Sequence, residues 1–109
     1  MDPKKTDLLQ GTLDLLVLKT LAHGPLHGYG IAQKILVSSR QVIDVQQGSL
    51  YPSLHRLERK GLVKAEWKES ESGRMAKFYS LTKAGRRHLS DEQEQWARFS
   101  AAINFVLEA

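Results

Sequence analysis

The sequence predicts a mainly α-helical protein with one small β-hairpin. Apolar residues recur every three or four positions in several segments, one stretch alternates with a period of two, and Gly or Pro ends the first and third helical segments. A chain of 109 residues is long enough for a single core. We therefore expect one compact unit, in which residues 1–82 form a domain and residues 83–109 a terminal helix.

The first helix is expected from about Asp7 to Ala22, where leucines cover much of the circumference. Thr6 or Asp7 can cap its start, and Gly24-Pro25 ends it. A helix this apolar is expected to be central in the fold or to face a partner chain.

A shorter second helix is expected from about His27 to Val37. Gly28 and Gly30 lie in its opening turn, where the absence of a side chain lets another backbone come close. The segment from Ser38 to Asp44 is expected to be a polar connection.

The third helix carries a narrow apolar stripe, formed by Leu50, Leu54 and Leu57. Proline is tolerated in a first helical turn, so Pro52 predicts a start near Gly48 or Ser49, with Ser49 as the cap. The helix is expected to end at Lys60-Gly61. The side opposite the leucines is polar and cationic and carries Pro52, His55, Arg56 and Arg59.

A β-hairpin follows. Residues 63–68 alternate between apolar and polar, residues 70–73 supply a turn, and residues 77–81 form the returning strand. Arg74 and Lys77 are expected at or near the tip, and Trp67 is expected to pack against the helices.

The final helix is expected to be capped by Thr82 and to reach almost to Ala109. It carries an apolar seam with spacings of three and four, formed by Leu89, Trp96, Phe99, Ile103 and Val106. So small a domain has little core left for the last turns to cover. Pairing with a second copy of the chain would bury them, so we expect a homodimer.

The charge pattern indicates a polyanionic partner. The net charge is +4 and the isoelectric point is near 9.5. The positive charge is local, because the segment from Arg74 to His88 contains several cations and no acid. The chain lacks cysteine and any apolar run of membrane-spanning length, so we expect a cytoplasmic protein that does not bind membranes.

The order of three helices, a hairpin and a long helix is typical of a winged helix-turn-helix domain. In such a domain the third helix enters the major groove of double-stranded DNA. Its N-terminal turn carries Gln46, Gln47, Ser49 and Tyr51, and glutamine can pair with an adenine edge as arginine does with guanine. On the wing, Arg74 and Lys77 would contact flanking phosphates or the minor groove.

Four motifs resemble the PadR family of bacterial transcriptional regulators. They are Leu8-Leu9-Gln10-Gly11-Thr12-Leu13, Gly28-Tyr29-Gly30-Ile31, the segment from Gly48 to Glu58, and the segment from Phe78 to Gly85. The resemblance covers nearly the whole chain, and the Gly48 to Glu58 motif is the most specific.

The resemblance implies a winged-helix dimer, paired through the terminal helix, that usually represses a nearby promoter. The two-fold symmetry of a dimer predicts a palindromic operator. The positions that match the family near DNA are Tyr29, Gln47, Ser49, Tyr51, Pro52, His55 and Arg56, with Arg74 and Lys77 on the wing. Some short members of the family bind flat aromatic compounds between interface tryptophans, and Trp96 lies in the comparable helix.

Other functions have less support. His23 and His27 are separated by a helix-breaking Gly24-Pro25, no motif frames a nucleophile, and Gly28-Tyr29-Gly30 follows no strand. We therefore expect no metal, no cofactor and no catalysis. An alternative role for Trp96 is to pack in the core of the dimer without binding any ligand. A protein-interaction module built on the same scaffold is an alternative, although it would not need a cationic third helix and wing together.

Overall fold

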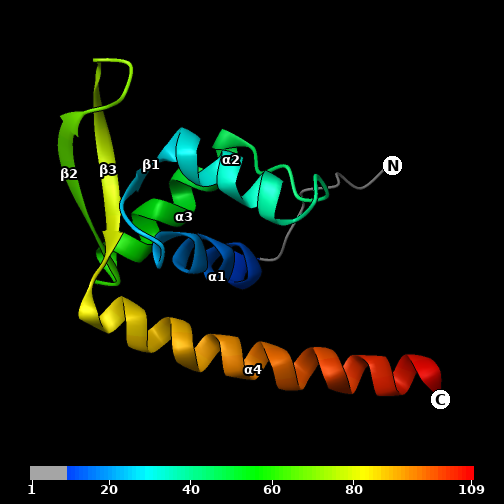
Figure 1. Cartoon of the computed structure of the whole chain (residues 1–109). Helices are drawn as coiled ribbons and strands as arrows, with labels where there is room; N and C mark the ends of the chain where they lie inside the picture. The colour runs from blue at the N-terminus through cyan, green and yellow to red at the C-terminus, as the bar shows by residue number, and fades with distance from the viewer. Residues whose placement is uncertain (1–9) are drawn as a thin grey trace.

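The computed structural model of the chain describes residues 10–109 and confirms the mainly helical class (Figure 1). Its elements are, in order, α1 (Gln10–Leu21), β1 (Leu26–His27), α2 (Gly28–Ser38), α3 (Gln47–Arg59), β2 (Val63–Glu69), β3 (Met75–Leu81) and α4 (Lys83–Glu108). The expected cap at Thr6 or Asp7 lies outside the described residues. Among residues 10–109, no helix combines the length and the hydropathy needed to cross a bilayer.

The first three helices form a compact body, and the wing, defined as residues 63–81, stands along one side of it (Figure 1). The sheet is antiparallel with the order β1-β3-β2. Strand β1 was not expected, because two residues are too few to show an alternating pattern. The expectation that Gly28-Tyr29-Gly30 follows no strand is therefore wrong, since β1 ends directly before Gly28. Strands β2 and β3 are both longer than expected, reaching Glu69 and starting at Met75.

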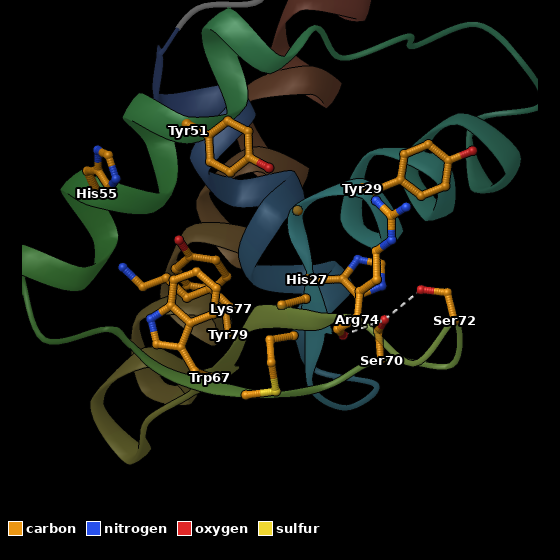
Figure 2. A pocket seen from close by; sticks show the side chains of 13 residues that line it. His27, Tyr29, Tyr51, His55, Trp67, Ser70, Ser72, Arg74, Lys77 and Tyr79 are labelled. Atoms are coloured by element: carbon orange, nitrogen blue, oxygen red, sulfur yellow. Dashed lines mark hydrogen bonds between the residues drawn. The ribbon is translucent and has the colours of Figure 1, made fainter.

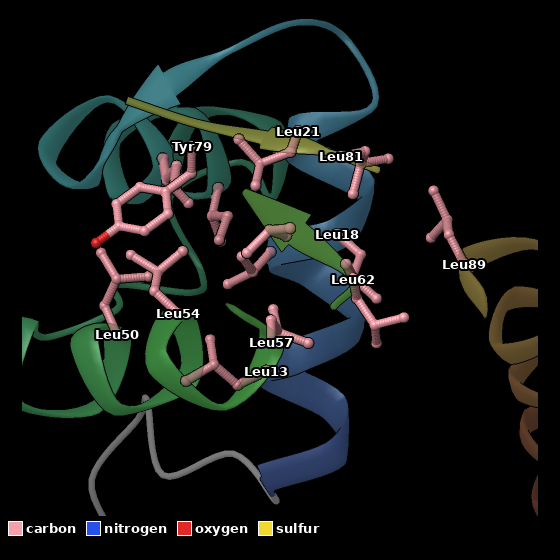
Figure 3. Close-up of a cluster of buried hydrophobic side chains, with 14 of the residues drawn as sticks. Leu13, Leu18, Leu21, Leu50, Leu54, Leu57, Leu62, Tyr79, Leu81 and Leu89 are labelled. Carbon is pink, nitrogen blue, oxygen red and sulfur yellow. The ribbon is translucent and has the colours of Figure 1, made fainter. Parts of the chain in front are cut away.

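The hydrophobic core lies between α1, α2, α3 and the base of the wing (Figure 3). Its largest fully buried side chains are Tyr79, Leu18, Leu21, Ile31, Leu50, Leu54 and Leu57. The three leucines expected on the apolar stripe of α3 are therefore core residues. Leu89 is only 7% exposed and belongs to the same cluster. Its expected place on a surface seam is wrong, because the first turns of α4 still pack on the body of the protein.

Helix α3 starts earlier than expected. It begins at Gln47, so Ser49 lies inside the first turn and is not the cap, while Gln46 is the cap residue without a side-chain hydrogen bond. Pro52 consequently lies inside the helix, where its missing N–H leaves the carbonyl of Gly48 without the usual intrahelical donor. Gly48 is exposed, so water can satisfy that carbonyl.

Two other helix starts have side-chain caps. His27 Nδ1 accepts a hydrogen bond from the Gly30 amide at the start of α2, at 3.1 Å. Thr82 Oγ1 accepts one from the Gly85 amide at the start of α4, at 3.0 Å, which confirms the expected cap. Each bond satisfies one of the amides that a helix start leaves unpaired.

The junction between β3 and α4 is tied to the turn before β2. The Thr82 amide donates to the Leu62 carbonyl at 3.1 Å, and Thr82 Oγ1 donates to the Gly61 carbonyl at 2.7 Å. Gly85 is buried directly above this turn, and a Cβ there would lie 2.0 Å from the Leu62 carbonyl oxygen. No residue separates the last strand from the cap of α4, so the helix has no flexible linker at its start.

We expect Gly85→Ala to lower the free energy of unfolding by about 2–3 kcal/mol, because the added methyl meets backbone that cannot move aside. Urea unfolding followed by circular dichroism measures this. Gly48→Ala is the matched control, since a Cβ there meets nothing within 4 Å. It should leave stability equal or raise it by up to about 1 kcal/mol. Equal stabilities for the two variants would contradict the packing described at Gly85.

Candidate DNA-binding surface

A groove of about 560 Å³ lies between the wing, the start of α2 and the middle of α3 (Figure 2). It brings together side chains from segments that are far apart in the sequence. Those that carry polar or aromatic groups are His27, Tyr29, Tyr51, His55, Trp67, Ser70, Ser72, Arg74, Lys77 and Tyr79. Five of the residues expected near DNA, namely Tyr29, Tyr51, His55, Arg74 and Lys77, therefore line one surface.

A second groove of about 510 Å³ adjoins the first between α2 and the start of α3. Gln46 and Gln47 line it, and Gly28 and Tyr29 belong to both grooves. Ser49 and Pro52 are exposed on α3 but line neither groove. The residues expected at the N-terminal end of α3 are thus all accessible, and the groove that Gln46 and Gln47 line is continuous with the groove of the wing through Gly28 and Tyr29.

Gly28 sets the position of Tyr51. A Cβ at Gly28 would lie 2.7 Å from the Tyr51 hydroxyl, so the close neighbour that this glycine admits is a phenol and not the expected backbone. The first turn of α2 and the second turn of α3 are packed against each other through this contact. Tyr51 is therefore held with its ring at the edge of the groove (Figure 2).

Tyr79 forms the buried floor of the groove. Burial raises the pKa of its phenol, and the nearby Glu58 carboxylate and Tyr51 add to that rise. The phenol therefore stays neutral well above neutral pH, and it adds no negative charge to the groove.

Lys77 lies along β3 and not at the wing tip. It pairs with Trp67 across the two strands, so both side chains are on the face of the wing that lines the groove. Its ammonium is 3.9 Å from a Glu58 carboxylate oxygen and 5.7 Å from the ring centre of Tyr79. Arg74 does lie in the turn, where Ser70 donates two hydrogen bonds to its carbonyl.

Trp67 was expected to pack against the helices, and this expectation is wrong. It is 64% exposed and lines the groove on the inner face of the wing. Alternation in β2 correctly placed it on the same face as Ala65, but burial along that face falls from the buried Val63 through the half-buried Ala65 to the exposed Trp67. The position of Trp67 near the turn of a long hairpin is the one feature of the sequence that indicates its exposure, because residues near such a turn lie far from the core.

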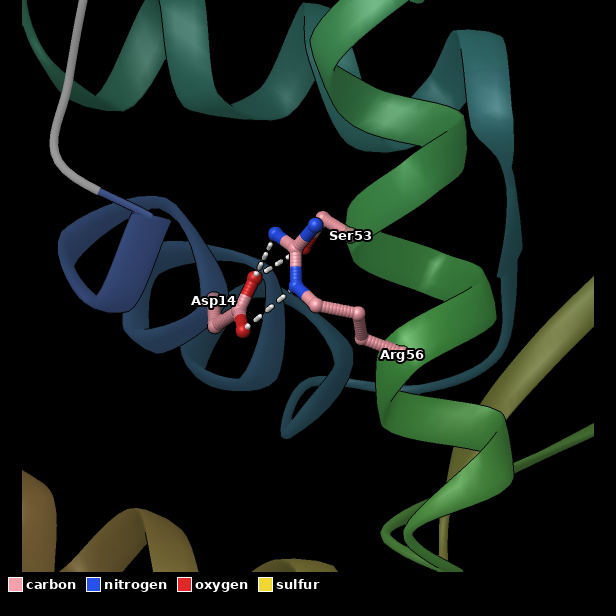
Figure 4. Close-up of polar contacts among 3 residues, drawn as sticks. All are labelled: Asp14, Ser53 and Arg56. Atoms are coloured by element: carbon pink, nitrogen blue, oxygen red, sulfur yellow. Dashed lines mark hydrogen bonds and ion pairs between the residues drawn. The ribbon is translucent and has the colours of Figure 1, made fainter.

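Arg56 does not lie on the free cationic side of α3. Its guanidinium binds the carboxylate of Asp14 on α1 through two nitrogens, with the shorter contact at 2.8 Å (Figure 4). The buried Ser53 hydroxyl donates to the same carboxylate. The Arg56 side chain is only 20% exposed. Its expected role in reading bases is corrected to one of joining α3 to α1.

The first groove is cationic. Among the described residues that line it, Arg74 and Lys77 are cations and none is a carboxylate, although the Glu58 carboxylate lies beside Lys77 outside the lining. Arg59 is exposed at the end of α3, outside this lining. Polyanionic ligands are therefore favoured over cationic ones at this surface.

The terminal helix presents a second accessible surface. After Leu89, the expected seam residues Trp96, Phe99, Ile103 and Val106 are all exposed, with Trp96 at 47%. Phe105 and Leu107 are exposed as well, so apolar side chains cover several sides of the last turns. A hollow of about 340 Å³ separates α4 from α1 beside Trp96, and Leu15 and Phe99 also line it.

Comparison with known proteins identifies the family. The model of the transcriptional regulator PadR-like family matches residues 17–91, which include α2, α3, the whole wing and the first turns of α4. The chain belongs to this family. As a PadR-like protein it is a transcriptional regulator and not an enzyme.

Individual relatives agree with this assignment. The transcriptional regulator Rv3488 of Mycobacterium tuberculosis is 37% identical over 79 residues, which cover 72% of this chain and 70% of the relative. A PadR family regulator from Eggerthella lenta is 33% identical with a TM-score of 0.76, covering 92% of this chain and 85% of that chain. A PadR-like regulator from Bacillus cereus is 27% identical with a TM-score of 0.79, covering 93% and 96%. These likenesses confirm the winged-helix fold.

We expect Arg56→Gln to lower the free energy of unfolding by about 1.5–3 kcal/mol, because it leaves the half-buried Asp14 carboxylate without its charged partner. Urea unfolding measures this. Arg59→Gln removes an exposed arginine from the same helix and should change stability by less than about 0.5 kcal/mol. The double variant Asp14→Asn/Arg56→Gln should cost less than the sum of its single changes. Wild-type stability in Arg56→Gln would contradict this role.

Proposed function

We propose that this PadR-like regulator represses transcription by binding a palindromic operator as a homodimer. The observation that carries the proposal is the continuous surface formed by the start of α3, Tyr29 and the inner face of the wing. This surface combines exposed amides, aromatic rings and cations on three elements, as an interface with both base edges and phosphates requires. The regulator would act in the cytoplasm, where bacterial DNA lies.

The two ends of the surface have different roles in this proposal. Gln46, Gln47 and Ser49 stand at the exposed start of α3, so they would read base edges in the major groove. Arg74 in the wing turn would contact phosphate or the adjacent minor groove, adding affinity with little sequence preference. Trp67 would lie against the sugar-phosphate backbone, beside Lys77.

The homodimer would form along α4. Trp96, Phe99, Ile103 and Val106 are exposed to a degree that is unfavourable for an isolated chain in water, and a second copy offers the same apolar surface in return. A symmetric pair would place two copies of α3 on the same side of DNA. Repression follows when such a site overlaps a promoter.

Selection of bound duplexes from a random DNA pool tests the proposal. We expect an enriched inverted repeat, whose affinity falls steeply between two salt concentrations because several cations per protomer displace counterions. The absence of any enriched motif, with only weak binding, would contradict the proposal and favour the protein-interaction alternative. Reporter transcription from a promoter that carries the repeat distinguishes repression from activation.

Two variants separate the roles within the surface. We expect Gln47→Ala to relax sequence preference at particular bases, with a loss of about 1–3 kcal/mol on the preferred site. Arg74→Ala should weaken binding to all sequences alike and reduce the salt dependence by about one counterion. Lys64→Ala is the matched control, because Lys64 is exposed on the opposite face of the wing. An equal loss in Lys64→Ala would show that the assigned face is wrong.

The hollow beside Trp96 favours a second function, the binding of a flat aromatic effector that relieves repression. We expect planar aromatic compounds to quench tryptophan fluorescence saturably, since an indole stacks on such rings. Quenching should be lost in Trp96→Ala and kept in Trp67→Ala, because the two tryptophans lie on α4 and on the wing. The lack of saturable quenching across a broad panel would leave Trp96 as a dimer-core residue only.

A further inference from the structure

A further cavity, of about 290 Å³, shares no lining residue with the two grooves or with the hollow beside Trp96. It is enclosed by the C-terminal halves of α1 and α2 and by the connection between α2 and α3, residues 39–46. Its lining consists of Leu16, Lys19, Thr20, His23, Lys34, Ile35, Ser38, Ser39 and Ile43. Every residue that lines the cavity belongs to the same chain.

The cavity is apolar inside and cationic outside. Leu16, Ile35 and Ile43 are buried or half-buried, whereas Lys19 and Lys34 are exposed at its rim. The lining contains no carboxylate, and neither lysine forms an ion pair within residues 10–109. Such a rim favours an anion, and such an interior favours a hydrocarbon body attached to it.

Two of the three hydroxyl groups of the cavity are already engaged, and the third, on Ser38, is exposed. Thr20 donates to the Leu16 carbonyl at 2.8 Å, and Ser39 donates to the Leu36 carbonyl at 3.1 Å. Ser39 also accepts a hydrogen bond from the Ile43 amide at 2.9 Å. A ligand would therefore be recognised by charge and shape, with little hydrogen bonding from the interior. The volume is at the small end for ligand pockets, so the ligand would be a small one.

The wall of this cavity leads directly to the DNA-reading end of α3. Ser39 and Ile43 line the cavity, and three residues after Ile43 comes Gln46, the cap residue of α3. Directly after Ser39, Arg40 and Gln41 have φ values of 56° and 70°. This left-handed conformation costs a non-glycine residue about 1–2 kcal/mol. Strain of this kind persists only where the surrounding structure holds it, so a ligand that contacts the connection can shift the balance between this conformation and a relaxed one.

We propose that this cavity binds a small organic carboxylate, and that the bound ligand alters operator affinity through residues 39–46. The carboxylate would lie between Lys19 and Lys34, with its hydrocarbon chain against Ile35 and Ile43. Binding itself is independent of DNA, whereas the effect on affinity rests on the proposed function. The alternative is a packing defect whose lysines are merely solvated.

Titration of the full chain with hexanoate, followed by amide chemical shifts in NMR, tests the binding step. We expect saturable shifts at Thr20, Ile35 and Ile43. Hexanamide has the same chain without the charge and should bind at least about tenfold more weakly, which corresponds to the loss of one good ion pair. Equal affinities for the two compounds, or no saturable hexanoate shift at these amides, would overturn the proposal.

Lysine variants test whether Lys19 and Lys34 bind the carboxylate of hexanoate. The double variant Lys19→Gln/Lys34→Gln should weaken hexanoate binding about tenfold or more, whereas Lys64→Gln removes an exposed lysine from the wing and should leave it unchanged. Hexanoate should then change operator affinity in the wild type and not in the double variant. If hexanoate binds but operator affinity does not change, the proposed effect on DNA binding is overturned and the proposed binding site is not. A chain that selects no DNA motif but binds hexanoate as described would overturn the proposed function and leave the cavity assignment standing.

Discussion

The contact of Asp14 with Arg56 and Ser53 fixes the helix on which DNA reading would depend. Ser53 and Arg56 are three residues apart, so they lie on the same side of α3, and both reach one carboxylate on α1. The leucine stripe alone could let α3 rotate or slide, because apolar packing has little directional preference. Two charge-assisted contacts at defined positions restrict that movement. The exposed amides at the start of α3 are oriented as a consequence.

The same helix is held from a second direction by α2. Gly28 admits the Tyr51 phenol, and His27 caps the helix that contains Gly28. His27 also packs edge-on against Phe78 of the wing, with ring centres 5.1 Å apart. One short segment thus connects the second helix, the third helix and the wing. This arrangement explains why residues from three separate elements form one continuous surface.

The sequence predicted the parts of this arrangement that repeat along the chain. The leucines of α3, the alternation in β2 and the Thr82 cap are local patterns with a known period or position. It could not show that Arg56 binds Asp14, because the partners are 42 residues apart and an exposed arginine has the same pattern. Strand β1 depends on pairing with β3 for its existence. The exposure of Trp67 depends on how far the wing extends beyond the helices, which no local pattern encodes.

The direct attachment of α4 to β3 has a geometrical consequence for a dimer paired along α4. Thr82 ends the wing side of the domain and caps α4, with bonds to Gly61 and Leu62 at the base of the wing. Each reading helix would then be joined to the symmetry axis by a rigid arm. DNA rotates by about a tenth of a turn per base pair, so one added base pair would move a half-site around the duplex. A rigid arm could not follow that rotation, so in such a dimer the distance between half-sites would become part of what is recognised.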